Sequence, residues 1–409
     1  MYDVMKGAPP LIRALLLTSL ILTIGRGLTL PFLAIFLTQQ RFMTPVQTGL
    51  VLGAGLTLAI LLSLYGGYLV DSFPKTRLIL CSMVCLGVSF FLLPLTASVI
   101  FLIILMALIN FSYSLFSLSI KAILAEWLTV SDRIKAFSAN HTLVNVGWAV
   151  GPPLSVAIAV KHPLSPFFLA GIISLMATLL LGKLLPNFGS TPQQKVEKSS
   201  SVTKQRYNFS QTLSILSRDW RFVWFILGGT LGSFVSSQFA SCISQYLMIA
   251  FDPDFAYKVL GIILPINASI VVLLQYLISR NITREALMKW LTFGSIFFLC
   301  GLILIIFAQR SIQLWIIAIA IFSLGEIIFI PVEYIFVDFI APTNLKGSYY
   351  GMQNISSLGG AVNPLLTGIL LTYTPPITIF VVMMLATLLS LYLFLKGFLL
   401  AIKCSRTGE

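Results

Sequence analysis

The sequence is poor in charged residues. Asp, Glu, Lys and Arg make up 10% of the 409 residues, whereas a soluble domain carries about 25%. Residues classed as hydrophobic make up 58%. This balance predicts an all-α membrane protein, because lipid takes the place of a water-excluded core.

Acidic residues, histidine and cysteine are scarce as well. The chain has 13 Asp and Glu, two His and five Cys, and the cysteines lack metal-ligand spacing. It also lacks a phosphate-binding glycine loop and a plausible Ser-His-Asp set. We therefore expect no metal, no cofactor, no enzymatic activity and no nucleotide-driven pumping. The formal net charge of +13 does not indicate nucleic acid, because the basic residues lie at the ends of apolar runs.

Long apolar runs are what the sequence does contain. A bilayer core of about 30 Å needs about 20 mostly apolar residues per helix. Twelve runs meet this need, near 11–38, 47–70, 78–96, 99–127, 134–160, 164–185, 220–250, 256–279, 286–308, 311–340, 347–373 and 376–400. They predict a six-helix bundle over 1–185, a polar cytoplasmic linker over 186–219 and a second six-helix bundle over 220–409.

The distribution of Lys and Arg predicts the orientation. If the amino terminus is cytoplasmic, 20 of the 26 basic residues fall on the cytoplasmic side and four on the other, while Arg26 and Lys121 lie inside spans. Both termini and the linker should therefore face the cytoplasm. We expect a monomer in a bacterial inner membrane, in contact with lipid.

The two predicted bundles resemble each other in detail. Three matches occur in order at offsets of about 208 to 212: 68–71 with 276–279, Glu126 with Asp338, and Gly147 and Pro152 with Gly359 and Pro364. Parallel six-helix repeats are a known plan of transporters, with a binding site near the midplane.

After the second run the chain reads GGYLVDSFPKTR. This resembles the G-x-L-x-D-x-x-G-R-[KR] signature of the major facilitator superfamily, with Pro74 where that family usually has Gly. In this gating-loop motif Gly67 would allow close helix contact and Asp71 would cap or pair across helices. Lys75 and Arg77 would anchor the cytoplasmic face.

The fifth run contains a second motif, GWAVGPPL, with Gly147, Gly151 and Pro152. It resembles the G-x-x-x-G-P motif of the antiporter branch, although Ser155 and Val156 replace that motif's trailing glycines. Small residues four apart let helices approach closely, and proline bends the helix.

The resemblance to this superfamily extends over essentially the whole chain. TIGRG followed by LPF in the first run, the lysine in the fourth, FASCISQY in the seventh and GEIIF-x-P-x-EY in the tenth are similar to one bacterial branch, the YdeE-like efflux permeases. This likeness implies export of dipeptides and other small compounds.

Four ionisable residues lie inside predicted spans: Arg26, Lys121, Glu326 and Glu333. A charge near mid-bilayer costs several kcal/mol unless it is paired or faces water. In the resembled family spans 1, 4, 7 and 10 line the central cavity, which would bring all four together. Two interpretations stay open: one glutamate, with Glu326 favoured by its depth, carries the proton, or the cations only neutralise the acids.

Polar stripes with helical spacing predict a wet cavity for substrate. They comprise Asn110, Tyr113 and Ser117 with Lys121, then His141, Asn145 and Trp148, and finally Gln238, Ser241 and Gln245. Each stripe could equally serve hydrogen bonding between helices. At the cytoplasmic helix ends, we expect Glu126, Asp132 and Asp338 to pair with Arg133, Lys135 or Lys346 as a closing lock.

These features favour a proton-coupled antiporter that exports small molecules such as drugs, dipeptides or sugars by alternating access. An importer of a nutrient or siderophore would use the same fold and charges. A membrane sensor that transports nothing is the third hypothesis, and it belongs to a different class.

Overall fold

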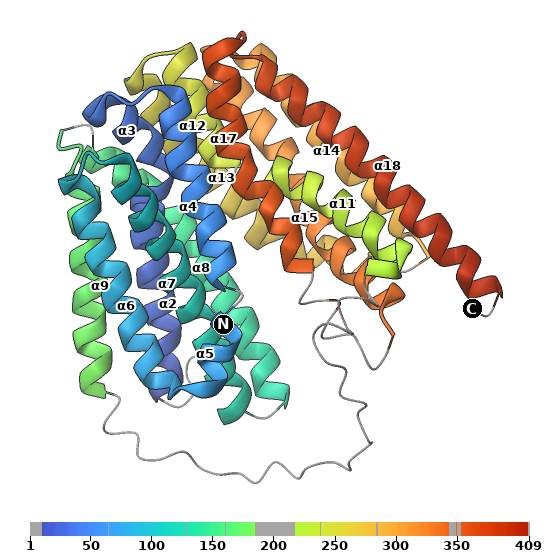
Figure 1. Cartoon of the computed structure of the whole chain (residues 1–409), viewed down its shortest axis with the longest axis horizontal. Coiled ribbons are helices and arrows are strands. Elements are labelled where there is room, and N and C mark those ends of the chain that lie inside the picture. Colours follow the sequence, from blue (N-terminus) through green and yellow to red (C-terminus); the bar gives the residue numbers. More distant parts are fainter. Residues whose placement is uncertain are drawn as a thin grey trace. The chain divides into compact units, whose positions relative to one another are not determined.

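The computed structural model is helical throughout the part of the chain that it describes (Figure 1). That part comprises residues 10–63, 65–128, 130–159, 161–184, 217–237, 239–283, 285–342, 349 and 353–407. No β-strand occurs within these ranges, so the predicted all-α class is confirmed. Nearly all of the predicted linker, and Gln238 and Lys346 with it, lies outside the described residues.

The helices follow the predicted runs. The first group comprises α2 (Pro10–Thr29), α3 (Leu33–Arg41), α4 (Pro45–Ser63), α5 (Gly66–Ser72), α6 (Lys75–Leu92), α7 (Val99–Trp127), α8 (Val130–Ala159) and α9 (Ser165–Leu184). The second comprises α11 (Trp220–Ser236), α12 (Phe239–Ala250), α13 (Pro253–Ser279), α14 (Leu287–Ala308), α15 (Ile312–Ile340), α17 (Ser357–Tyr373) and α18 (Thr378–Thr407).

The predicted count of twelve spans is not confirmed among the described residues. Within the described ranges ten helices are long and apolar enough to cross a membrane, or eleven if α11 and α12, which meet at 45°, form one bent span. The predicted run 347–373 accounts for the difference. Only its second part, the 17-residue α17, is described as a helix, and 17 residues are fewer than the about 20 of a typical span.

Besides the run that holds α11 and α12, two predicted runs are each broken into two helices. A short 3-10 segment, Leu30–Phe32, separates α2 from α3, and it contains Pro31, which cannot donate the helical hydrogen bond. The run 47–70 divides into α4 and α5 just before the Gly66-Gly67 pair, because adjacent small residues are common sites of sharp kinks.

Contacts divide the chain into two compact units. Unit 1 is Met1–Pro192, Ala240–Ser269 and Pro364–Pro376, and unit 2 is Gln193–Phe239, Ile270–Asn363 and Ile377–Glu409. In unit 1, α2 packs along α8 and α9, and α7 along α4 and α6. In unit 2, α14 packs along α15, and α11 along α18. The two continuous six-helix halves remain a prediction.

A cluster of phenylalanine side chains lies in the interior of unit 2. Phe225 of α11 stacks on Phe336 of α15, with 5.0 Å between ring centroids, and meets Phe394 of α18 edge-on at 5.4 Å. Phe329 of α15 meets Phe394 at 5.6 Å. Such aromatic pairs add about 0.5–1.5 kcal/mol each beyond area burial, so this cluster ties α11, α15 and α18 together.

A close approach in unit 1 joins α2 to α8. A Cβ atom added to Gly147 would lie 2.8 Å from Thr23 Cβ, and one added to Gly151 would lie 2.7 Å from Gly27 Cα. No real side chain fits at such distances. The glycines of the predicted G-x-x-x-G motif therefore let two spans pack backbone to backbone.

Unit 2 repeats this arrangement between α11 and α17. A Cβ atom on Gly359 would meet the Thr230 carbonyl oxygen, and Asn363 Nδ2 donates a 2.8 Å hydrogen bond to Phe234 O. These pairs are the counterparts of Gly147 with Thr23 and of Gly151 with Gly27. The internal repeat predicted from the sequence is thus present in the helix packing.

Candidate functional site

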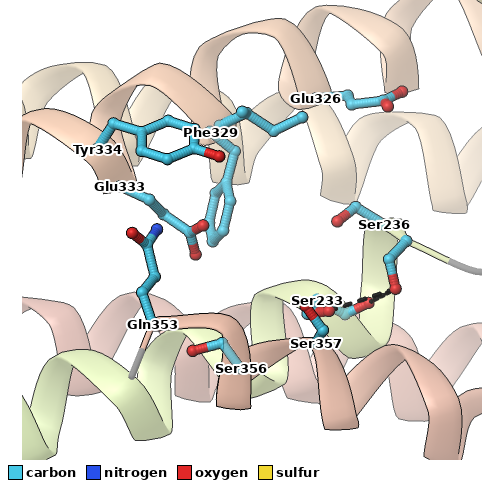
Figure 2. A pocket seen from close by; sticks show the side chains of 11 residues that line it. Ser233, Ser236, Glu326, Phe329, Glu333, Tyr334, Gln353, Ser356 and Ser357 are labelled. Atoms are coloured by element: carbon cyan, nitrogen blue, oxygen red, sulfur yellow. Dashed lines mark hydrogen bonds between the residues drawn. The ribbon is translucent and has the colours of Figure 1, made fainter. Parts of the chain in front are cut away.

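A cavity of about 320 Å³ lies inside unit 2, between α11, α15 and the segment that begins α17. Most of its lining residues are of polar type, and they include both intramembrane glutamates: Ser233, Ser236, Ser237, Glu326, Phe329, Ile330, Glu333, Tyr334, Gln353, Ser356 and Ser357. Figure 2 shows these side chains. A volume near 300 Å³ is at the small end of ligand pockets.

α15 places both acids in this cavity. Glu326 and Glu333 lie seven residues apart, which is two helical turns, and so share one face. The other side of the helix carries the buried Ile328, Val332 and Phe336. This apolar face packs into the unit and turns the two acids toward the cavity, where Figure 2 shows them at separate ends.

The contacts recorded for the Glu333 carboxyl are uncharged. The side chain of Gln353 hydrogen-bonds to it (Figure 2). A Cβ atom on Gly229 would lie 3.1 Å from Glu333 Oε1 and 2.9 Å from Ser356 Oγ, so the absence of a side chain at Gly229 makes room for the acid. Nothing in the sequence pattern marks Gly229, Gln353 or Ser356, because only the fold brings them near Glu333.

No lysine or arginine occurs among the described residues that line this cavity. The serines at its other wall bond to one another or to backbone: Ser237 Oγ donates to Ser233 O at 2.8 Å, and Ser236 Oγ donates to Gly232 O at 3.0 Å. The lining can therefore exchange hydrogen bonds and protons, and its acidic side chains have no basic residue beside them among the described lining residues.

A second polar cluster surrounds Arg26 in unit 1. Arg26 Nη2 donates to Asn110 Oδ1 at 3.2 Å, and its Cζ lies 3.9 Å from the centroid of the Tyr113 ring and 5.7 Å from that of Trp148. Arg26 Nε is buried and has no hydrogen-bond partner in the described part of the chain. Three predicted cavity residues thus gather around one predicted charge.

The Tyr113 ring is held by a directional hydrogen bond. Thr23 Oγ1 lies 2.7 Å from Ser19 O, to which it donates its only hydroxyl proton. Thr23 Oγ1 is also 3.0 Å from Tyr113 Oη, so Tyr113 must be the donor there. This bond fixes one aromatic face against the guanidinium.

The remaining predicted cavity residues do not join either cluster. Lys121 and His141 are exposed, and Ser117 and Ser241 are half-buried. Asn145 Nδ2 donates to His141 O at 3.0 Å, a bond within α8 and not one of the hydrogen bonds between helices that the alternative interpretation proposes. Gln245 is buried and donates to Pro364 O at 3.2 Å, a bond inside unit 1. Gln238 is outside the described residues.

The loop motif differs from expectation at two points. Lys75 Nζ forms a 2.7 Å ion pair with Glu126 Oε1. The side chains of the expected partners Arg133, Lys135 and Lys346 lie outside the described residues. Apart from its chain neighbours and its own helix backbone, no described atom lies within 4 Å of a Cβ atom placed on Gly67. The predicted close helix contact at Gly67 is therefore not found among the described residues. Arg77 is exposed, and the side chain of Asp71 is outside the described part.

A charged cluster lies outside the spans, at the N-terminal end of α11. Asp219 caps this helix, accepts from Arg221 Nε at 2.8 Å, and accepts from Tyr349 Oη at 2.7 Å. Burial alone would raise the pKa of the Asp219 carboxyl. The hydrogen bonds from Arg221 and Tyr349, with the Arg221 charge, outweigh burial and hold the pKa below its ordinary value. The cluster thus contains a charged acid.

Comparison with known proteins identifies the family to which this chain is similar. The Major Facilitator Superfamily profile matches residues 15–362. The uncharacterised MFS-type transporter YdeE of Escherichia coli K12 is 38% identical over 384 residues, 94% of each protein. A Na+, Li+, K+/H+ antiporter of Planococcus maritimus is 25% identical over 82% of this chain and 83% of the antiporter. The solved nucleoside transporter NupG matches with a TM-score of 0.76 at 13% identity, over 95% of this chain and 99% of its own, a likeness of fold alone.

Proposed function

Because the chain belongs to the major facilitator superfamily of membrane transporters, we propose that it moves a small molecule in exchange for protons, with Glu326 and Glu333 as the proton-carrying groups. The observation that carries this proposal is the cavity of unit 2. Two acids share one lining, and no lysine or arginine occurs among the described lining residues.

The physical argument concerns the cost of charge inside a membrane. An ionised carboxyl near mid-bilayer costs several kcal/mol unless it is paired or hydrated. Taking up a proton removes that cost, and a cavity filled from one side of the membrane lets the proton return to water there. Glu333 is the stronger candidate, because its recorded neighbours Gln353, Ser356 and Gly229 are uncharged.

We further propose that transport is export. The G-x-x-x-G-P motif with Gly147, Gly151 and Pro152 supports antiport, and so does the antiporter of Planococcus maritimus among the relatives. Two six-helix halves would rock about a central site. The excess of Lys and Arg on one side supports cytoplasmic termini in a bacterial inner membrane. An importer of a nutrient or siderophore is the second candidate.

The test begins with a thermal-shift screen of dipeptides, sugars, drugs and siderophores on the purified protein. Hits are then assayed in proteoliposomes with an imposed pH gradient. Glu333→Gln should abolish gradient-driven transport but retain exchange of substrate without a gradient, and Glu326→Gln is measured beside it. Full gradient-driven transport by both variants would contradict the proposal. The sign of the pH gradient that drives uptake into oriented vesicles separates export from import.

A further inference from the structure

Arg26 is a cation inside a span whose recorded contacts are all neutral. It donates to the Asn110 amide oxygen and faces the rings of Tyr113 and Trp148. Its Nε–H group is buried without an acceptor in the described residues. A buried donor left without a partner is unfavourable, and a guanidinium inside a membrane is costly. A missing anionic partner would account for both.

The acids of unit 1 do not supply that partner among the described side chains. They are Glu126, Asp132, Asp252 and Asp254, and all lie at helix ends. Glu126 pairs with Lys75, and Asp252 Oδ1 accepts from Phe255 N at 2.9 Å. Arg26 itself lies near the middle of the span Pro10–Arg41.

The internal repeat indicates that the Arg26 position faces a cavity. Thr23 of α2 corresponds to Thr230 of α11, since each packs on the equivalent glycine of its unit. Three residues further on, Arg26 corresponds to Ser233, which lines the cavity of unit 2. The same helix position is thus used for the lining in unit 2, and in unit 1 it carries a cation.

The geometry of the cluster around Arg26 favours a carboxylate as the missing anion. A guanidinium is planar, and its N–H donors point outward in that plane. Aromatic rings lie against Arg26, with Tyr113 fixed by its bond to Thr23, so the free N–H donors of Arg26 point along the edge of the guanidinium. A carboxylate is planar and matches such an edge with two parallel hydrogen bonds. The half-buried Trp148 ring offers an apolar face beside it.

We propose that Arg26, Asn110, Tyr113 and Trp148 form a subsite for the carboxylate of the transported molecule, and that substrates are small carboxylates with a flat or apolar group next to the acid. This inference rests on the proposed transport function, whose substrate class it names. It assigns Arg26 to substrate binding rather than to proton transfer.

The experiment compares acids with their own amides. Full-length protein in detergent is titrated with matched pairs: dipeptides with free and amidated carboxyl termini, N-acetyl aromatic amino acids and their amides, and 2-naphthoate and 2-naphthamide. Wild type should bind the acid of at least one pair about tenfold or more tightly than the amide. Arg26→Gln should remove that preference, and Arg26→Lys should restore part of it, because the charge returns without the planar fork.

The control removes one positive charge elsewhere. Lys161 is exposed, and Lys161→Gln should keep the full acid preference. Retained binding of the amide by Arg26→Gln shows that this variant is folded. Equal binding of acid and amide in every pair by wild type, or an unchanged preference in Arg26→Gln, would overturn the proposal. So would tighter binding of phenylphosphonate than of benzoate.

Failure here is separable from failure of proton coupling. Glu333→Gln should keep the Arg26-dependent acid preference while it loses gradient-driven transport. Gradient-driven transport of ligands without any acid preference refutes the subsite and leaves the transport function standing. An acid preference that depends on Arg26, in a protein that moves neither solute nor protons, supports the subsite and refutes the transport function.

Discussion

Replacing Gly151 by alanine tests the contact between α2 and α8 on which the Arg26 cluster depends. The added Cβ atom would lie 2.7 Å from Gly27 Cα, 2.8 Å from Gly27 C and 2.9 Å from Ile24 O. Non-bonded carbon atoms prefer separations of about 3.5–4.0 Å. The two backbones must therefore move apart by about 1 Å, and Arg26, next to Gly27, moves with α2.

The change in the free energy of unfolding caused by Gly151→Ala follows from two opposing contributions. Overpacking a well-packed site costs about 1–3 kcal/mol, while alanine in place of glycine inside a helix is worth about 0.5–1 kcal/mol in its favour. The atoms that obstruct the new methyl group belong to backbone and cannot rotate away. We expect the free energy of unfolding to fall by about 1–2 kcal/mol. We also expect a weaker preference for acid over amide in the binding assay.

Thermal unfolding in one detergent measures the loss, with Gly182→Ala as the matched control. Gly182 also lies in a span, but a Cβ atom there would be 3.9 Å from its nearest neighbour, an atom of the Leu80 side chain, which is an ordinary contact. Gly151→Ala should lower the apparent Tm by on the order of 2–5 °C, and Gly182→Ala should leave it unchanged or raise it. Gly151→Ala at wild-type stability would refute the packing argument.

Two further predictions concern unit 2. Gly229→Ala would bring a methyl group within 3.1 Å of Glu333 Oε1, so it should impair proton-coupled transport more than it lowers stability; equal loss of both would contradict a specific effect on the acid. Tyr349→Phe removes the 2.7 Å bond to Asp219 and should cost about 1.5–3 kcal/mol at pH 7, as a hydrogen bond to a charged group. Because the pKa of Asp219 is below its ordinary value of about 3.9, this stabilisation is present above that pH and is lost as the pH falls through the lowered pKa. The difference in Tm between wild type and Tyr349→Phe should therefore shrink below about pH 4, and a constant difference would mean that the carboxylate charge is irrelevant.

The helical class, the family and the repeat could be predicted from the sequence because they depend on local properties. In lipid each span must satisfy its backbone hydrogen bonds within itself, so its hydropathy and length are visible in one stretch of chain. The motifs around Asp71 and Gly147 indicated the superfamily, and the comparison with YdeE confirms that resemblance. The spacing of Glu326 and Glu333 likewise predicted a shared face, and both line one cavity.

The partners of those residues were decided only by the tertiary structure, because they come from segments far apart in the chain. Gly67 and Gly151 are both motif glycines, yet Gly151 touches a neighbouring backbone and Gly67 touches nothing described. Nothing local to Arg26 predicts that Asn110, 84 positions away, accepts its hydrogen bond. The sequence by itself thus determined which residues lie inside the membrane. Helix packing decided which of them meet, since apolar spans pack by the fit of surfaces that sequence spacing does not record.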